Sequence, residues 1–239
     1  MYHGKGVLSS PSFIYTGDFL YGKRDGHGKQ VDLLKHSTYE GEWVNDLQDG
    51  KGEEQYEDGS KYVGMFSKGE KSGIGKLTLK NGSYYEGEFL NDKLHGNGTF
   101  IWDKNKNYKG EWNNNEICGY GIMEDENSKH VGYFDKDTKW GLGATMYKGS
   151  RVIILGKWEN GELDGIGILY NGDWKEEKNE NIFIASKGKI VQRNIREDMK
   201  NNIRGKEEYI NMKKLFVSKL YNDLCDIKEE KDNVIFNFD

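Results

Sequence analysis

The chain has 239 residues and a formal net charge of −5, and only 35% of its residues are hydrophobic, fewer than one globule of this size would usually bury. Residues 181–239 carry 12 basic and 10 acidic side chains, and the rest carry 23 and 30, so the composition excludes generic nucleic-acid binding. Two isolated cysteines and the lack of a visible secretory signal or long apolar run argue against a disulfide framework and a membrane span, and we expect a cytoplasmic protein.

A repeat of about 23 residues organises the chain. Each copy has the pattern Tyr-x-Gly-x-Trp/Phe followed by Gly-x-Gly, and the first element, Gly4-x-Gly6, is only the second half of a copy. A natural cap, completion by a partner and a short gene model each explain that half repeat. Seven fuller copies follow, with the lead residues Tyr15, Tyr39, Tyr62, Tyr85, Tyr108, His130 and Ile154. So regular a period predicts stacked supersecondary units.

Each copy is predicted to form a β-hairpin. In Tyr39-Glu40-Gly41-Glu42-Trp43 the first, third and fifth residues share one face of a strand, and the two glutamates belong on the other face, in water. We expect the glycines to make room for aromatic rings from neighbouring strands. The pairs Asp58-Gly59, Asn81-Gly82 and Asn171-Gly172 predict two-residue hairpin turns.

These residues resemble the MORN repeat (membrane occupation and recognition nexus) family over about residues 2–174. The resemblance implies an all-β repeat: an elongated, single-layer antiparallel β-meander of about seven hairpins, with an aromatic groove. His130 and Ile154 depart from the lead tyrosine, which puts any role of that tyrosine in doubt in those two copies. The family occurs in cytoskeletal scaffolds, in axonemal and membrane-junction proteins, and as an accessory module of lipid kinases and methyltransferases.

The pattern stops after Trp174, which divides the chain into a repeat array at 1–174, a basic connector at 175–205 and a C-terminal part at 206–239. Within the connector, residues 182–192 are suited to one last hairpin. Apolar residues then recur at spacings of three or four, which predicts an amphipathic helix over 206–228. This helix either folds back onto the last repeat or docks a partner or a second copy of the chain. The closing segment 234–238 is suited to pairing with a sheet edge.

Three sets of residues are candidate binding sites. The ring set is expected to pack within the sheet and to contact a partner peptide or helix; it consists of Tyr15, Phe19, Tyr39, Trp43, Tyr62, Phe66, Tyr85, Phe89, Tyr108 and Trp112. The docking-helix set consists of Tyr209, Met212, Phe216, Leu220, Leu224 and Ile227. The basic set, either a solvated connector or a site for acidic lipid or an acidic partner, consists of Lys187, Lys189, Arg193, Arg196, Lys200, Arg204 and Lys206.

No residue pattern predicts catalysis or a bound metal. The histidines have no paired ligand at zinc spacing, and Gly73-Ile74-Gly75-Lys76 lacks the spacing of a phosphate-binding loop. Asp103-x-Asn105-x-Asn107 begins like a calcium loop, but Tyr108 and Asn114 stand where that loop needs glycine and glutamate. We therefore expect neither an enzyme nor a cofactor.

Binding is the function that remains. The leading hypothesis is a non-catalytic scaffold or adaptor that holds protein partners along the aromatic-lined sheet, in a cytoskeletal, ciliary or axonemal assembly, with homodimerisation as an option. One alternative is a peripheral membrane adaptor that contacts anionic phospholipid through residues 187–206. Another is an accessory subunit that regulates a separate kinase or methyltransferase.

Overall fold

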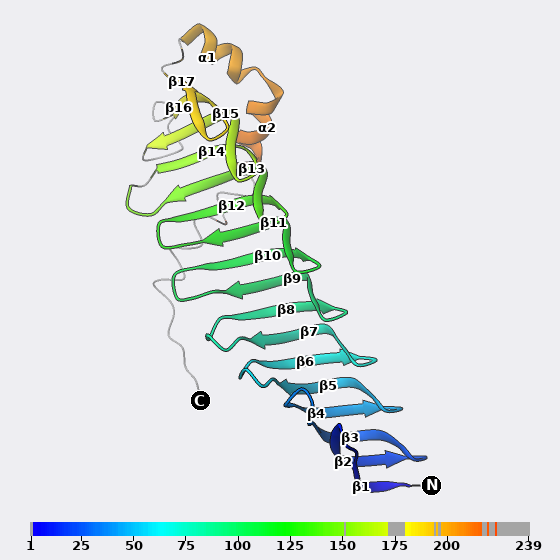
Figure 1. Cartoon of the computed structure of the whole chain (residues 1–239). Coiled ribbons are helices and arrows are strands. Elements are labelled where there is room, and N and C mark those ends of the chain that lie inside the picture. Colours follow the sequence, from blue (N-terminus) through cyan, green and yellow to red (C-terminus); the bar gives the residue numbers. More distant parts are fainter. Residues whose placement is uncertain are drawn as a thin grey trace, which may run out of the picture. The chain divides into compact units, whose positions relative to one another are not determined.

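The computed structural model describes residues 2–150, 152–171, 180–193, 195, 197–216, 219 and 223. The chain forms two compact units, Met1–Glu116 (unit 1) and Ile117–Asp239 (unit 2), and the division falls inside the repeat array. Within each unit, every described strand pairs antiparallel with the next strand along the chain (Figure 1). This is the all-β meander that the repeat pattern predicts.

Unit 1 is one antiparallel sheet built from hairpins. In this sheet the glycine of each Tyr-x-Gly lies directly opposite the second glycine of the following Gly-x-Gly, as Gly41 lies opposite Gly52. The strands are β1 (Gly4–Ser9), β2 (Phe13–Leu20), β3 (Lys23–Asp32), β4 (Ser37–Val44), β5 (Leu47–Gln55), β6 (Lys61–Ser67), β7 (Glu70–Thr78), β8 (Tyr84–Leu90), β9 (Lys93–Ile101) and β10 (Asn107–Asn113).

The two faces of the sheet in unit 1 differ in chemistry. One face, called the ring face, carries the tyrosines and the Trp or Phe side chains, because the two rings of a strand are four positions apart and alternate residues share a face. The other face, called the opposite face, carries exposed charges that pair across strands. Lys29 lies 3.2 Å from Glu40, and Lys76 lies 3.3 Å from Glu86. The expected alternation of buried rings and solvated glutamates is confirmed.

A two-residue turn follows each strand that carries the Tyr-x-Gly-x-Trp/Phe pattern, and successive turns stack on one another. At Asn45 and Asp46 both φ angles are positive, 49° and 72°, as a type I′ turn requires. The Asp46 N–H donates to the Arg24 carbonyl at 2.9 Å, and Asp46 Oδ1 accepts the Arg24 N–H at 2.9 Å. Each turn is thereby joined to a strand start about one repeat earlier.

The predicted two-residue turns at Asp58-Gly59 and Asn81-Gly82 are wrong in length. Residues 56–60 separate β5 from β6, and the Gly59 N–H donates to the Tyr56 carbonyl at 3.0 Å. The reason is a side-chain bond: Asp58 Oδ1 accepts the Ser60 N–H at 2.8 Å, which forms an Asx turn inside a longer loop. Asn81 bonds Ser83 in the same way.

Unit 2 continues the hairpin pattern and adds helices. The predicted hairpin at 182–192 is confirmed as β16 and β17, whereas the connector also contains a helix, α1, that was not predicted. The strands are β11 (Glu116–Glu124), β12 (Ser128–Asp135), β13 (Thr138–Tyr147), β14 (Val152–Glu159), β15 (Glu162–Asn171), β16 (Glu180–Ser186) and β17 (Lys189–Gln192), and the helices are α1 (Glu197–Arg204) and α2 (Glu207–Leu215).

In unit 2 the helices α1 and α2 cover the opposite face of the predicted β-meander (Figure 1). A row of directly paired residues on that face is apolar and packs with the helices. The row is Ile122, Val131, Ala144, Leu155, Ile168 and Ile182. The equivalent row in unit 1 holds Lys29, Glu40, Lys76 and Glu86. Apolar residues on both faces of a strand need cover on both sides, and α1 and α2 supply it on this one.

Several predictions fall outside the described residues. They concern Leu220, Leu224 and Ile227 of the helix predicted at 206–228, the tail at 234–238, the completed turn at Asn171-Gly172, and Arg196 of the basic set. Within the described part, α2 begins at Glu207, close to the predicted start, with Glu207 and Glu208 in its first turn, where the helix dipole favours acids.

Candidate functional site

The predicted ring residues of unit 1 form a continuous column on the ring face. Within a repeat the two rings meet edge to face, as Tyr39 and Trp43 do with centroids 5.2 Å apart. The same tyrosine then meets the ring of the next repeat, as Tyr39 and Phe66 do at 5.0 Å. This geometry suits the aromatic quadrupole. The contacts run in the order Phe19, Tyr15, Trp43, Tyr39, Phe66, Tyr62, Phe89, Tyr85, Trp112 and Tyr108.

Each tyrosine hydroxyl of the column is used inside its own repeat. The Tyr62 hydroxyl donates to the Met65 carbonyl at 2.9 Å, and a Cβ placed on Gly75 would lie 2.3 Å from that hydroxyl. Glycine is therefore required where the ring lies, as the sequence predicted. Burial raises the pKa of Tyr62 to about 12, so its hydroxyl remains a donor at neutral pH.

The column leaves its members little surface for a partner. All except Phe19 are at most 5% exposed. The packing role predicted for these rings is confirmed. The prediction that they also contact a partner stays a prediction, and a partner on this face would first meet the side chains that lie beside the rings.

Those neighbouring side chains line a hollow of about 480 Å³ on the ring face of unit 1, called the unit 1 hollow. Its walls combine aromatic, amide and charged groups from β2, β3, β4, β5 and β7 and from the turns and loops between β3 and β9. The lining residues are Phe13, Arg24, Gln30, Asp32, Lys35, Ser37, Tyr39, Trp43, Asp46, Leu47, Gln48, Glu54, Gly69, Lys71 and Asp92.

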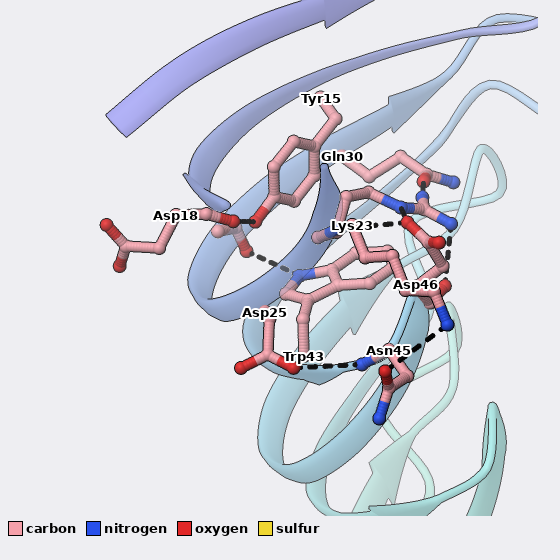
Figure 2. A network of polar contacts seen from close by, with 10 residues as sticks. Tyr15, Asp18, Lys23, Asp25, Gln30, Trp43, Asn45 and Asp46 are labelled. Carbon is pink, nitrogen blue, oxygen red and sulfur yellow. Dashed lines mark hydrogen bonds and ion pairs between the residues drawn. The ribbon is translucent and has the colours of Figure 1, made fainter. Parts of the chain in front are cut away.

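Arg24 is held rigidly at one end of this hollow. Its guanidinium lies over the Trp43 ring, 4.3 Å from the centroid, and its Nε donates to Asp46 Oδ1 at 3.3 Å. A further guanidinium N–H donates to Gln30 Oε1, and another donates to the Asp46 carbonyl at 2.6 Å. Figure 2 shows Gln30, Trp43 and Asp46 converging on this point. The arrangement combines a cation–π contact with an ion pair.

Lys71 occupies the equivalent position two repeats later. Its Nζ lies 2.8 Å from Glu54 Oε2 and 3.5 Å from Asp92 Oδ1, and it lies over the Tyr62 ring at 5.3 Å. Glu54 Oε2 also accepts a hydrogen bond from the Tyr56 hydroxyl at 2.5 Å. Both cations are therefore anchored by carboxylates and rings, and their side chains are only 16% and 13% exposed.

The ring face of unit 1 changes from polar to apolar along the array. One position of each repeat lies directly opposite the next lead tyrosine, and it is occupied in turn by Gln30, Glu54, Leu77 and Phe100. Phe100 contacts Trp102 with ring centroids 4.7 Å apart. The early repeats thus offer hydrogen-bonding and charged groups, and the later ones offer half-buried apolar groups.

The docking-helix prediction is corrected for the described residues of that set. Tyr209, Met212 and Phe216 are buried against the sheet of unit 2, with Phe216 stacked on Tyr170 at 6.0 Å between centroids. Lys213 Nζ donates to the Tyr170 hydroxyl at 2.7 Å. The fold-back alternative is the observed one, because the sheet face beneath this helix is itself apolar and needs the cover.

The basic set is spread over several elements of unit 2. Lys187 lies in the turn between β16 and β17, Lys189 lies in β17, and Arg193 follows that strand; all three are exposed. Two exposed apolar residues of β17 lie among them, Ile190 at 39% and Val191 at 63%. Lys200 and Arg204 are half-buried in α1, and Lys206 is exposed before α2.

Sequence reasoning missed the charged residues of the unit 1 hollow. The signal was in the repeat: the position two residues before each Gly-x-Gly is Arg24, then Gln48, Lys71 and Leu94. This position points to the ring face, and each of these four copies has a different residue there. Positions that the fold leaves free to vary are the ones that carry specificity in a repeat protein.

Neither described helix has the length and apolar character to cross a membrane. Nowhere in the part of the chain that the structure describes do three His, Cys, Asp or Glu side chains gather so that they could hold a metal ion.

Comparison with known proteins adds the family. The model of the MORN repeat, a repeat consistent with interactions with proteins or membranes, matches residues 1–12, 15–32, 39–61, 62–84, 85–106, 108–128 and 156–176. It passes over the copy led by His130, although β12 and β13 form its hairpin in the structure. No curated protein matches the chain. Since the matched segments cover more than half of the residues, the chain belongs to the MORN repeat family.

Proposed function

We propose that this chain is a non-catalytic scaffold or adaptor that binds a protein partner on the ring face of unit 1. The observation that carries the proposal is the unit 1 hollow, where Arg24 and Lys71 are held rigidly beside polar groups. The rings are occupied with one another, so the variable side chains next to them offer the recognition surface. Pre-organised polar groups in a concave site favour specific binding, because little ordering cost remains.

The test is recovery of partners from cells by affinity purification and mass spectrometry, with the intact chain as bait. The same purification is repeated with a variant that carries Arg24→Gln and Lys71→Gln, which remove both anchored cations. We expect some partners to be captured by the intact chain and lost with this variant. Capture of the same set by both chains would contradict binding at the hollow.

Within this proposal, we place the protein in the cytoplasm, in a cytoskeletal or ciliary assembly, and as a binding module without enzymatic activity of its own. The support is the family and the repeat architecture alone. The same purification tests it: a set of specific partners without any cytoskeletal or ciliary protein would remove this part of the proposal.

A second candidate function is contact with anionic phospholipid through the C-terminal end of unit 2. It is favoured by the exposed pair Ile190 and Val191 among the cations Lys187, Lys189 and Arg193. Basic residues contribute about 1 kcal/mol each near an anionic membrane surface. Sedimentation with vesicles that contain phosphoinositide, over a salt series, tests it with Lys187→Glu/Lys189→Glu as the variant. No sedimentation of the intact chain at low salt would eliminate it.

A further inference from the structure

Strand β1 forms the outer edge of the sheet in unit 1 (Figure 1). It pairs with β2 through all six of its residues, without a bulge, and no other strand of the described residues pairs with it. The Gly22 N–H donates to the Tyr2 carbonyl at 3.0 Å, and the Ser10 N–H donates to the Phe13 carbonyl at 2.9 Å, so the backbone is held at both ends of the strand. A regular and ordered edge of this kind is ready to pair with a further strand.

The end of the sheet at β1 exposes more apolar surface than the inner strands do. Residues 2–21 carry six exposed large apolar side chains, whereas the much longer segment 37–101 carries five. The six are Tyr2, Val7, Leu8, Ile14, Leu20 and Tyr21. Exposed apolar side chains that gather in one region of the surface mark an interaction site.

The ring column ends at Phe19, with one side of that ring uncovered. Trp43 lies between the rings of Tyr15 and Tyr39, 5.2 Å from each. Among the described rings, Phe19 meets only Tyr15, at 5.3 Å, and it is half-buried. Gly4 lies directly opposite Phe19, and a Cβ on Gly4 would meet nothing within 4 Å. The first side chain on the far side of Gly4 would therefore cover Phe19.

A row of glycines fixes the register of a further strand. In every pairing of unit 1 a glycine faces a glycine, as Gly6 faces Gly17. The chains approach closely in this row, where a Cβ on Gly17 would lie 2.4 Å from the Cα of Gly28. A Cβ on Gly6 would meet only the Phe19 ring, at 3.1 Å, so no group of the described residues lies over Gly6 from the free edge. A strand that continues the row places a glycine opposite Gly6.

We propose that β1 pairs edge to edge and antiparallel with β1 of a second copy of this chain, with Gly6 facing Gly6. The second copy supplies the glycine that continues the row, and the two-fold axis at Gly6 makes the contact self-complementary. Counting outward from Gly6, Leu8 of the second copy lies opposite Gly4. Leu8 is 42% exposed in the single chain and would cover the open side of Phe19 in the pair.

The other face of the paired strands fits this register as well. Lys5 lies opposite Val7 of the second copy, and the aliphatic stem of the lysine covers the valine. The Lys5 ammonium remains 3.1 Å from Asp18 of its own chain. No two like charges face each other across the paired strands. Pairing along an edge leaves the ring face open, so the dimer goes beyond the proposed function and does not depend on it.

Analytical ultracentrifugation of the full chain over a range of concentrations measures the monomer–dimer equilibrium. One pair of strands is a small interface, so we expect a dissociation constant on the order of 10–100 µM. Two variants at one position test the register. Val7→Glu places a carboxylate opposite Lys5 of the second copy, and Val7→Lys places two cations there. Val7 is 68% exposed in the single chain, so both variants should fold, which thermal unfolding checks.

The matched controls are Val63→Glu and Val63→Lys. Val63 lies on the same face, is 46% exposed and belongs to β6, which pairs with a strand on each side, so these variants change the net charge without changing the edge. We expect Val7→Lys to dimerise about tenfold more weakly than Val7→Glu, and the two Val63 variants to dimerise equally. The difference at Val7 should shrink as salt is raised. Leu8→Gln, which removes the apolar cover of Phe19, should weaken the dimer as well.

Several results would overturn the dimer. A chain that stays monomeric up to about 1 mM, ten times the upper end of the expected range, has no such contact. A mass that rises past that of two chains indicates a different assembly. Equal dimerisation of the two Val7 variants, the same difference at Val63, or a Leu8→Gln chain that dimerises as tightly as the parent excludes this register. Each of these results leaves the proposed partner binding at the unit 1 hollow untouched, because that is tested at Arg24 and Lys71.

Discussion

The smallest unit of this fold is a tyrosine ring lying over glycines. The Tyr62 ring fills the space beside Gly64 and Gly75, and its hydroxyl reaches the carbonyl of Met65. The sheet of unit 1 has no second layer on which to bury its rings. Each ring therefore packs against neighbouring rings and over glycines, where no Cβ stands in its way. Glycine at these positions is a packing requirement.

Gly75→Ala is expected to destabilise unit 1 by more than about 3 kcal/mol, because the new methyl group would overlap the Tyr62 ring. The control is Gly59→Ala in a loop, where a Cβ meets nothing within 4 Å. This substitution should cost only about 1 kcal/mol, because alanine disfavours the positive φ of 89° at that position. Urea unfolding of both variants measures the two losses. Similar values for the two would contradict the packing argument.

His130 replaces the lead tyrosine in unit 2 and takes its place among the rings, 5.1 Å from Trp158 and 5.4 Å from Phe134. Its Nδ1 bonds the Thr145 hydroxyl at 2.8 Å, and its buried Nε2 has no partner among the described residues. Burial, followed by the nearby charge of Lys139, holds the pKa of His130 well below its ordinary value. The native ring is therefore neutral.

A pH dependence follows from this depressed pKa. The unfolded chain takes up a proton on His130 near pH 6.5, whereas the native ring does not, so its contribution to stability is complete above about pH 6.5 and falls as the pH decreases. The variant His130→Tyr, which restores the repeat, should lose less stability between pH 7.5 and pH 5 than the parent. The exposed His3→Tyr is the control. Urea unfolding at both pH values measures the difference, and parallel losses in parent and His130→Tyr would contradict it.

At the scale of the element, the stacked two-residue turns join each repeat to the one before it. When the second turn residue is Asp or Asn, it makes two hydrogen bonds to one residue of the preceding repeat. Its N–H donates to the carbonyl of that residue, and its side-chain oxygen accepts the N–H of that residue. Asn115 does so at Leu94, at 3.0 Å and 2.8 Å. In the turn at Lys68 and Gly69 the glycine makes only the backbone bond to Gln48, at 2.8 Å, while the Lys68 N–H donates to Asp49 Oδ2 at 3.1 Å.

Gly69→Asn is expected to stabilise unit 1 by about 1 kcal/mol, the usual net worth of one added hydrogen bond. Asparagine tolerates the positive φ at this position, 92° in the parent, and its Oδ1 would accept the Gln48 N–H. Gly69→Ala tests the backbone alone and should destabilise. The melting temperatures of the two variants decide between these expectations, and a Gly69→Asn chain no more stable than Gly69→Ala would rule out the added bond.

At the scale of the whole molecule, the two units use the opposite face differently. In unit 1 this face is charged and exposed, with Lys29 and Glu40 at 53% and 54% side-chain exposure. In unit 2 it is apolar and carries α1 and α2, with Met212 only 2% exposed. The C-terminal helices are therefore part of the fold of unit 2, and removing residues 206–239 would uncover its core.

Met212→Asp is expected to cost unit 2 about 3 kcal/mol or more, because a carboxylate would be buried among apolar side chains. Hydrogen exchange should show lost protection at strands β12 to β16 and unchanged protection at β4 to β8. The exposed Ile210→Asp, on the same helix at 38% exposure, is the control. Loss of protection in β4 to β8 alone would contradict the assignment of these helices to unit 2.

The sequence by itself determined the hairpins, their order and the pairing of rings with glycines, because the 23-residue period and the alternation within a strand are local and repeat many times. It left the unit 1 hollow undetected, since Lys71, Glu54 and Asp92 come from different repeats and meet only when the strands pair. It also left open whether Tyr209, Met212 and Phe216 face a partner or the sheet. An apolar stripe specifies only that something must cover it, and the tertiary structure decided that the apolar face of unit 2 does so.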